Sequence, residues 1–471
     1  LTANRNILLN PGSSITSSSG NISLNANSSG TTTGSFNGIV LSGATLRTTG
    51  AGNLILQGTS GDSGGVAGVK ILDASVIEST SSAADAGDIS ISATNKSSGF
   101  ASYGLHLNNN SALRTVNGDL SLSGNNIATG GSVGNDGIRA ESGVQVQSSG
   151  TGNLTVAGTV GAGVPQSRGV VFAFGSTVAA TGSGAIEVTG TGNNFYGVEI
   201  YRSSLSSLAG TLTLRGSDLG TGQGVKLTTG SLLSSTGVID LVSDQSIVLD
   251  SGSSITSTSG AIVLNSDRDA SGNGTIFLDG ATLTTDSGEI ILSGGNGATL
   301  TDLKTTGFAR PTNGTYKDGV TLNNTTITST SGDITIRGQG GIYSGNRYDA
   351  NYGIKVIGSN VSSTAGAVQL VGIGGTQNVN NNDGIRTEGN NTFQTTTGSI
   401  SLTGTGGTST NLGLQGIRTG SGTLNLTSLG SGTLNLTGTG GTSSVYDYGL
   451  LLFGFNIASA GGTVTFTGTG G

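Results

Sequence analysis

The sequence predicts an all-β protein: a right-handed, single-stranded parallel β-helix (a solenoid) of about 15 coils, with three short strands per coil. Three observations lead to this prediction. A body of about 20 residues recurs along the chain, apolar and small polar residues alternate within it, and the distance between successive bodies varies almost entirely at one place. We expect residues 1–471 to form one continuous repeat domain and to be a fragment of a longer protein.

The composition is unusual for a globular protein and is explained by a repeat. The 471 residues include 87 glycines and no cysteine, and only 33% are hydrophobic and 10% charged. Disordered chains are usually richer in charge and poorer in β-branched residues, whereas Ile, Val and Leu recur here at regular spacing. Gly, Ser, Thr and Asn are poor helix formers. A long ladder of backbone hydrogen bonds can supply the stability that disulfides would otherwise provide.

Each repeat contains three short strands. Residues 38–58, 246–265 and 319–338 show them most clearly. The first strand has the pattern Gly-apolar-x-apolar, the second centres on one apolar residue, and the third is apolar-x-apolar. Alternation places Ile39 and Leu41, Leu46, and Leu54 and Leu56 on the interior side. Glycines are expected at the corners because tight turns require positive φ.

The repeats differ in length almost entirely between the third strand and the next first strand. First strands are expected near Gly38, Gly68, Gly104, Gly137, Gly169, Gly197, Gly224, Ser246, Thr275, Gly319, Gly353, Gly384, Gly413 and Gly449. The spacing runs from 22 residues (Gly224 to Ser246) to 44 residues (Thr275 to Gly319). Loops leaving one corner do not disturb a stack, which at ~4.8 Å per coil would be on the order of 70 Å long. Specific function is therefore expected along that looped edge and the adjacent first-strand face.

The repeats resemble those of large bacterial exoproteins. Residues 7–24 (ILLNPGSSITSSSGNISL), 247–264 (IVLDSGSSITSTSGAIVL) and 399–408 (SISLTGTGGT) are similar to the filamentous-haemagglutinin-like passengers of two-partner secretion. The resemblance covers essentially the whole chain, although the family's N-terminal secretion domain is not evident. It implies a secreted or cell-surface bacterial fibre used in adhesion, aggregation or matrix building. It also implies export through an outer-membrane transporter.

Six basic residues share one predicted position on the first strands, and they form the first candidate ligand-binding set. They are Lys70, His106, Arg139, Lys226, Lys355 and Arg386. One hypothesis is a groove for an acidic glycan. The alternative is a solvated face with ion pairs between coils, which the acids Glu141, Glu199 and Glu388 at nearby positions favour.

Tyrosines that directly precede first-strand glycines form the second candidate set. They are Tyr103, Tyr196, Tyr352 and Tyr448. They either cover the exposed edge of the apolar column or stack on sugars, since loops carry recognition on repeat scaffolds.

The sequence offers no catalytic set, no metal site and no cofactor site. His106 is the only histidine and lies at an outward position without a recognisable partner. Asp267 and Asp269 lie in a loop that only faintly resembles a calcium loop, so an ordinary turn is the favoured interpretation.

We therefore predict a non-enzymatic secreted or surface fibre that contacts host-cell or matrix glycans or proteins, or associates with itself. One alternative is a carbohydrate-binding or polysaccharide-cleaving β-helix, and another is a self-assembling sheath or filament subunit. The net charge of −7 argues against a nucleic-acid partner. No apolar run approaches about 18 residues, so membrane insertion is not expected.

Overall fold

A computed structural model describes residues 1–130, 133–295, 299–311, 316–342, 350–376, 381–409, 413–442 and 445–471. The chain forms two compact units, Leu1–Gly237 (unit 1) and Val238–Gly471 (unit 2). The predicted fold class is confirmed, because each unit is a parallel β-solenoid with three short strands per coil. One continuous domain over both units stays a prediction.

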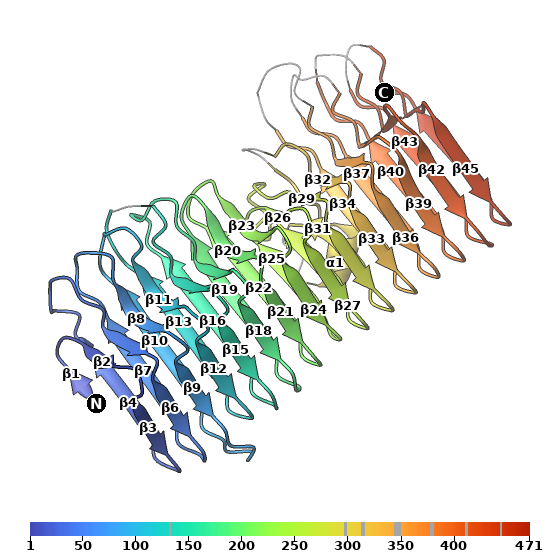
Figure 1. The fold of residues 1–471 in the computed structure, drawn as a ribbon. Helices are drawn as coiled ribbons and strands as arrows, with labels where there is room; N and C mark the ends of the chain where they lie inside the picture. The colour runs from blue at the N-terminus through green and yellow to red at the C-terminus, as the bar shows by residue number, and fades with distance from the viewer. Residues whose placement is uncertain are drawn as a thin grey trace. The chain divides into compact units, whose positions relative to one another are not determined.

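Unit 1 contains three parallel sheets (Figure 1), named for the order of their strands within a coil. The first-strand sheet contains β2 (Ile7–Leu9), β5 (Ile39–Ser42), β8 (Ala67–Leu72), β11 (Tyr103–Leu107), β14 (Ile138–Glu141), β17 (Val170–Ala173), β20 (Tyr196–Tyr201) and β23 (Gln223–Thr228). The second-strand sheet contains β3 (Ser14–Ser17), β6 (Thr45–Thr48), β9 (Val76–Ser79), β12 (Ala112–Thr115), β15 (Gln145–Ser148), β18 (Thr177–Ala180), β21 (Ser204–Ser207) and β24 (Leu232–Ser235). The third-strand sheet contains β1 (Thr2–Ala3), β4 (Ile22–Ala26), β7 (Leu54–Thr59), β10 (Ile89–Asn95), β13 (Leu120–Asn126), β16 (Leu154–Val160), β19 (Ile186–Gly192) and β22 (Leu212–Asp218).

Unit 2 repeats this arrangement. Its first-strand sheet contains β26 (Ile247–Leu249), β29 (Ile276–Asp279), β32 (Val320–Asn323), β35 (Ile354–Ile357), β38 (Ile385–Glu388), β41 (Ile417–Thr419) and β44 (Leu450–Leu451). Its second-strand sheet contains β27 (Ser254–Ser257), β30 (Thr282–Thr285), β33 (Thr326–Ser329), β36 (Asn360–Ser363), β39 (Asn391–Thr395), β42 (Leu424–Ser428) and β45 (Phe455–Ser459). Its third-strand sheet contains β25 (Ile239–Ser243), β28 (Ile262–Ser266), β31 (Ile290–Gly294), β34 (Ile334–Gln339), β37 (Val368–Ile373), β40 (Ile400–Thr405), β43 (Leu434–Thr439) and β46 (Val464–Thr469).

The core of each unit is a column of stacked apolar residues. Equivalent residues pair directly between coils, as Leu113 does with Ile77 on one side and Val146 on the other. Along β16 buried residues alternate with more exposed ones, as the period-two pattern predicts. Leu154 and Val156 of that strand are fully buried. Each coil is therefore stabilised mainly by its two neighbours.

Two kinds of glycine occur at the corners, and the predicted reason holds for one of them. Gly143, after the first strand β14, has φ 77° and makes the turn that positive φ allows. Gly137, before the same strand, does not have positive φ. A Cβ there would lie 2.5 Å from the Thr159 nitrogen and 2.6 Å from the Gly169 oxygen. Close approach of backbones, rather than turn geometry, requires glycine where a third strand meets a first strand.

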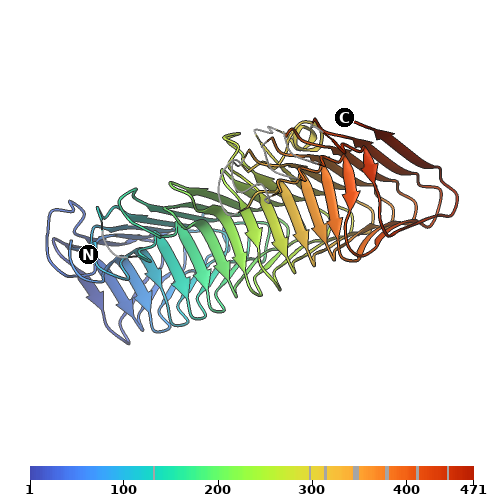
Figure 2. The same ribbon diagram turned by 90° about the horizontal axis from the view of Figure 1, so that it is seen from above.

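The longest insertion lies in the coil between β31 and β32 and contains helix α1 (Leu300–Thr305). The Thr299 side chain caps α1, and Asp302 completes a capping box. Leu303 of α1 packs on Val263 and Ile291, so the helix covers outward apolar residues of the third-strand sheet. Figure 2 shows α1 on the outer side of these strands. Among the described residues, no helix is long and apolar enough to cross a membrane.

Candidate binding surface on the first-strand sheets

The predicted basic residues occupy one register position on the first-strand sheets. In unit 1, His106 pairs with Lys70 on one side and with Arg139 on the other, and Glu199 pairs with Lys226. Val171 separates Arg139 from Glu199.

In unit 2, Lys355 pairs with Arg386, which pairs with Arg418. Arg418 was missed because its first strand was expected near Gly413. The triplet Gly416-Ile417-Arg418 repeats Gly384-Ile385-Arg386 and would have revealed it.

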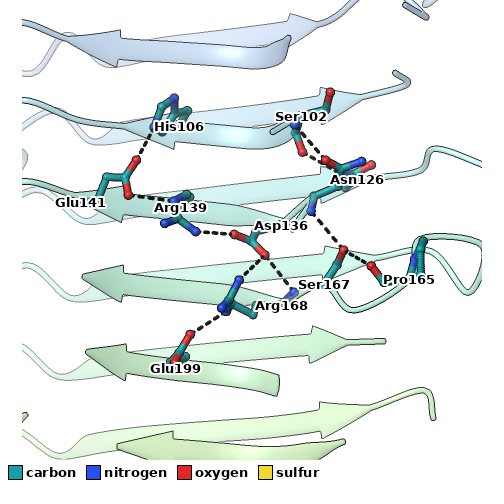
Figure 3. Close-up of polar contacts among 11 residues, drawn as sticks. Ser102, His106, Asn126, Asp136, Arg139, Glu141, Pro165, Ser167, Arg168 and Glu199 are labelled. Carbon is teal, nitrogen blue, oxygen red and sulfur yellow. Dashed lines mark hydrogen bonds and ion pairs between the residues drawn. The ribbon is translucent and has the colours of Figure 1, made fainter. Parts of the chain in front are cut away.

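Four of the charged groups of unit 1 form a chain of contacts across neighbouring coils (Figure 3). Nε2 of His106 lies 3.2 Å from Oε1 of Glu141. The other Glu141 oxygen, Oε2, accepts a hydrogen bond from Nε of Arg139 at 2.9 Å. Arg139 Nη1 donates to Oδ2 of the buried Asp136 at 3.1 Å. The hydrogen bond from His106, helped by the charge of Arg139, outweighs burial and lowers the pKa of Glu141.

The contacts continue into the next coil through Arg168. Its backbone N–H donates to Asp136 Oδ1 at 3.0 Å, and its Nη1 lies 3.6 Å from the same oxygen. Its Nε donates to Oε2 of Glu199 at 2.6 Å. Acids therefore alternate with the cations along this face, which is the arrangement that the ion-pair alternative predicts. An open anion groove does not describe this part of unit 1.

Three tyrosines of the second candidate set pack against basic residues of the first. Tyr103 is buried and its ring centroid lies 4.7 Å from that of His106. Tyr196 lies 5.3 Å from the Lys226 ammonium, and the buried Tyr352 lies 5.5 Å from that of Lys355. These distances permit cation–π attraction. Tyr448 differs, because 46% of its surface is exposed. A binding role for either set stays a prediction.

Unit 2 repeats a seven-residue pattern of unit 1. Residues 382–388 (NDGIRTE) correspond to residues 135–141 (NDGIRAE). Nε of Arg386 donates to Glu388 at 3.2 Å, while Lys355 from the preceding coil lies 3.7 Å from the same carboxylate. Asp383 is fully buried.

Asp383 has weaker partners than its counterpart Asp136. Its Oδ2 lies 3.7 Å from Nη1 of Arg386, and neither atom has a hydrogen-bond partner. In the next coil Gln415 stands at the position of Arg168, and its backbone N–H donates to Asp383 Oδ1 at 3.1 Å. Burial therefore dominates and raises the pKa of Asp383 to about 7.

Both units also have a hollow on the first-strand sheet. In unit 2 a pocket of about 490 Å³ is lined by Phe277, Tyr316, Lys317, Asp318, Thr321, Asn323, Ala350, Tyr352, Lys355 and Ile357. In unit 1 a pocket of about 250 Å³ is lined by Arg139, Arg168, Val171, Ala173, Phe174, Glu199, Tyr201 and Thr228. Each combines an aromatic wall with charged groups. Among the lining residues, the predicted sets contain only Arg139, Tyr352 and Lys355.

The Asp267 loop forms an ordinary tight turn. Oδ1 of Asp267 accepts hydrogen bonds from the backbone N–H groups of Gly272 at 2.7 Å and Asn273 at 3.1 Å. Burial nevertheless raises its pKa to about 6. In the part of the chain that the structure describes, no three His, Cys, Asp or Glu residues are grouped so that they could hold a metal ion.

No family model, curated protein or solved structure matches this chain.

Proposed function

We propose that this chain is a non-enzymatic module of a secreted or cell-surface bacterial fibre, which reaches the surface through an outer-membrane transporter. In this proposal the coils are a scaffold and the first-strand sheets make adhesive contacts. One observation carries it: a pocket lies on the first-strand sheet of each unit, and in unit 2 the insertion after α1 supplies part of the pocket lining. The resemblance to filamentous-haemagglutinin-like passengers adds the export route and the location.

A solenoid suits this role because its outward groups repeat along one face. Individual contacts through paired charges and partly covered rings are weak. Many copies presented in parallel on a cell or a fibre can still bind tightly, because later contacts form at a high effective concentration. A surface of this kind needs neither a catalytic group nor a single deep site.

The experiment uses latex beads coated with the whole purified chain. We expect these beads to aggregate, or to bind epithelial monolayers or collagen-coated wells, above albumin-coated beads. The test variant carries Tyr196→Ala and Lys226→Ala, which remove a contacting pair from the first-strand sheet. The matched control carries Arg114→Ala and Gln145→Ala, a contacting pair from the second-strand sheet.

Adhesion should fall severalfold with the first-strand pair and stay unchanged with the control pair. The proposal fails if coated beads behave like albumin beads in every assay. Its assignment of the contact face fails if the control pair reduces adhesion as much as the test pair does.

A further inference from the structure

The pocket of unit 2 exists because the longest insertion returns over the first-strand sheet. After α1, Arg310 and Gly274 form a backbone bridge, so the insertion runs back beside β29. Tyr316 then places its ring against Phe277, with 4.8 Å between centroids and 35° between planes. Phe277 occupies the outward register position at which Thr321 and Lys355 stand in the next two coils. The insertion and the sheet together therefore build a partly exposed aromatic wall.

Fixed polar groups line the same pocket. The Asp318 carboxylate accepts hydrogen bonds from the backbone N–H of Tyr352 at 2.9 Å and from the Thr321 hydroxyl at 3.2 Å. Asn323 donates through Nδ2 to Asp279 at 2.7 Å, which fixes the orientation of its amide. Protein surrounds the Asp318 carboxyl on most sides and raises its pKa to about 6, although the residue keeps some solvent contact. These groups are held in place before any ligand arrives.

The charges around the pocket are mixed in sign. Lys317 and Lys355 line it together with Asp318, and Glu388 lies 3.7 Å from the Lys355 ammonium. A strongly charged ligand would meet a like charge on one side of the pocket. A neutral ligand with many hydroxyl groups meets both hydrogen-bond donors and hydrogen-bond acceptors instead.

We propose that this pocket binds one neutral hexopyranose ring of a glycan. A pyranose has a C–H face that packs on an aromatic wall and a rim of hydroxyl groups that suits a carboxylate, a hydroxyl and an amide. The volume of about 490 Å³ lies in the ordinary range of small-molecule sites, roughly 300–1,000 Å³. The proposal deepens the function proposed above and rests on it for biological meaning.

Unit 1 shows the same combination independently. Its pocket sets the edge-to-face pair Phe174 and Tyr201, with 5.0 Å between centroids, beside Arg168 and Glu199. At about 250 Å³ it is smaller and its charges are paired with one another. The larger pocket of unit 2 is therefore the one to which we assign the sugar.

The test is saturation-transfer NMR on the whole chain with methyl glycosides of mannose, galactose, glucose and N-acetylglucosamine, and with glucuronate as an acidic comparison. We expect transfer to the ring C–H protons of at least one neutral glycoside. Phe277→Ala and Tyr316→Ala should each weaken that binding by at least about tenfold. Phe277→Tyr, which keeps an aromatic wall, and Phe453→Ala, which removes an exposed ring outside the pocket, should leave it unchanged.

The inference is overturned if no neutral glycoside binds, if only glucuronate binds, or if the two wall substitutions have no effect. Far-UV circular dichroism checks the fold of each variant. Should Phe277→Ala disturb the sheet, Tyr316→Ala in the insertion decides alone. Beads that adhere without any sugar binding refute this inference only, whereas sugar binding by a chain that does not adhere refutes the adhesive function only.

Discussion

Phe172→Ala tests whether the interior of unit 1 is packed coil by coil. Phe172 is 1% exposed and pairs in register with Ala140 in the coil before and Ile200 in the coil after. Burying the ring contributes about 2 kcal/mol of transfer free energy. A residual cavity of about 100 Å³, at about 24 cal/mol per Å³, adds about 2.4 kcal/mol. We expect the free energy of unfolding to fall by about 4–5 kcal/mol, at the upper end for such a change because the small Ala140 side chain cannot fill the gap.

The assay is urea unfolding followed by far-UV circular dichroism, with hydrogen exchange of peptides from β14, β17 and β20. Phe174→Ala is the matched control. Phe174 is 48% exposed, so only its edge-to-face contact with Tyr201 is lost, at about 1 kcal/mol.

Ala140→Leu makes the test sharper, because its effect on the free energy of unfolding should have opposite signs in the original chain and in the Phe172→Ala variant. Alone it overfills the column and should cost about 1–3 kcal/mol. Together with Phe172→Ala it fills part of the cavity and should restore stability. The same sign of effect in both backgrounds would refute the coil-by-coil packing.

Three further predictions concern backbone approach, buried charge and pH. Gly137→Ala should lower the free energy of unfolding by about 2 kcal/mol or more, since its Cβ would lie 2.5 Å from a backbone nitrogen. Gly161→Ala, whose nearest neighbour would lie at 3.6 Å, should change it by less than about 0.5 kcal/mol in the same urea assay. Arg168→Ala removes the cation that lies 2.6 Å from the buried Glu199 carboxylate and should cost about 3 kcal/mol, whereas Arg215→Ala, from a half-exposed pair, should cost less than about 1 kcal/mol. The pKa of Asp383 is raised to about 7, so the folded chain holds that proton more tightly than the unfolded chain does. The protonated Asp383 therefore contributes its full stabilisation below about pH 4. As the pH rises to about 7 this contribution is lost, and the free energy of unfolding falls by up to about 4 kcal/mol. Asp383→Asn should remove that loss, and thermal unfolding from pH 4 to 8 measures it.

The sequence was sufficient to predict the fold because a stack of coils depends on local spacing alone. Buried Ile39 and Leu41 alternate with the more exposed Val40 and Ser42, and the same spacing returns in each coil, so interior and exterior follow from one period. The register that brings His106 beside Arg139 follows from the same rule. The conformation of Gly137 did not follow, because the contacts that demand glycine come from Thr159, in the third strand of the same coil, and from Gly169 of the next coil.

The unit 2 pocket could not be predicted in this way. Phe277 and Tyr316 are 39 positions apart, and Tyr316 lies in an insertion that obeys no period. The only signal was Phe277 itself, an aromatic residue at an outward first-strand position that is otherwise polar, charged or aliphatic. Contacts between an insertion and the sheet depend on how the loop folds, which the repeat does not specify.

The division between a regular body and one variable corner explains where the chain can accept insertions. A change within a strand shifts the register of two neighbouring coils and exposes a whole row of apolar side chains. A longer corner loop costs little, since each doubling of loop length adds only about 0.6 kcal/mol of closure entropy. Stability is also close to a sum over neighbouring coils, so an insertion in one coil leaves distant coils undisturbed. The insertion between β31 and β32 shows the result: it adds a capped helix and the Tyr316 ring, while Thr326 of β33 still pairs in register with Thr282 of the preceding coil. Surface chemistry can therefore change one coil at a time on the first-strand sheet, and the pocket that we assign to a sugar is built in this way from the longest insertion.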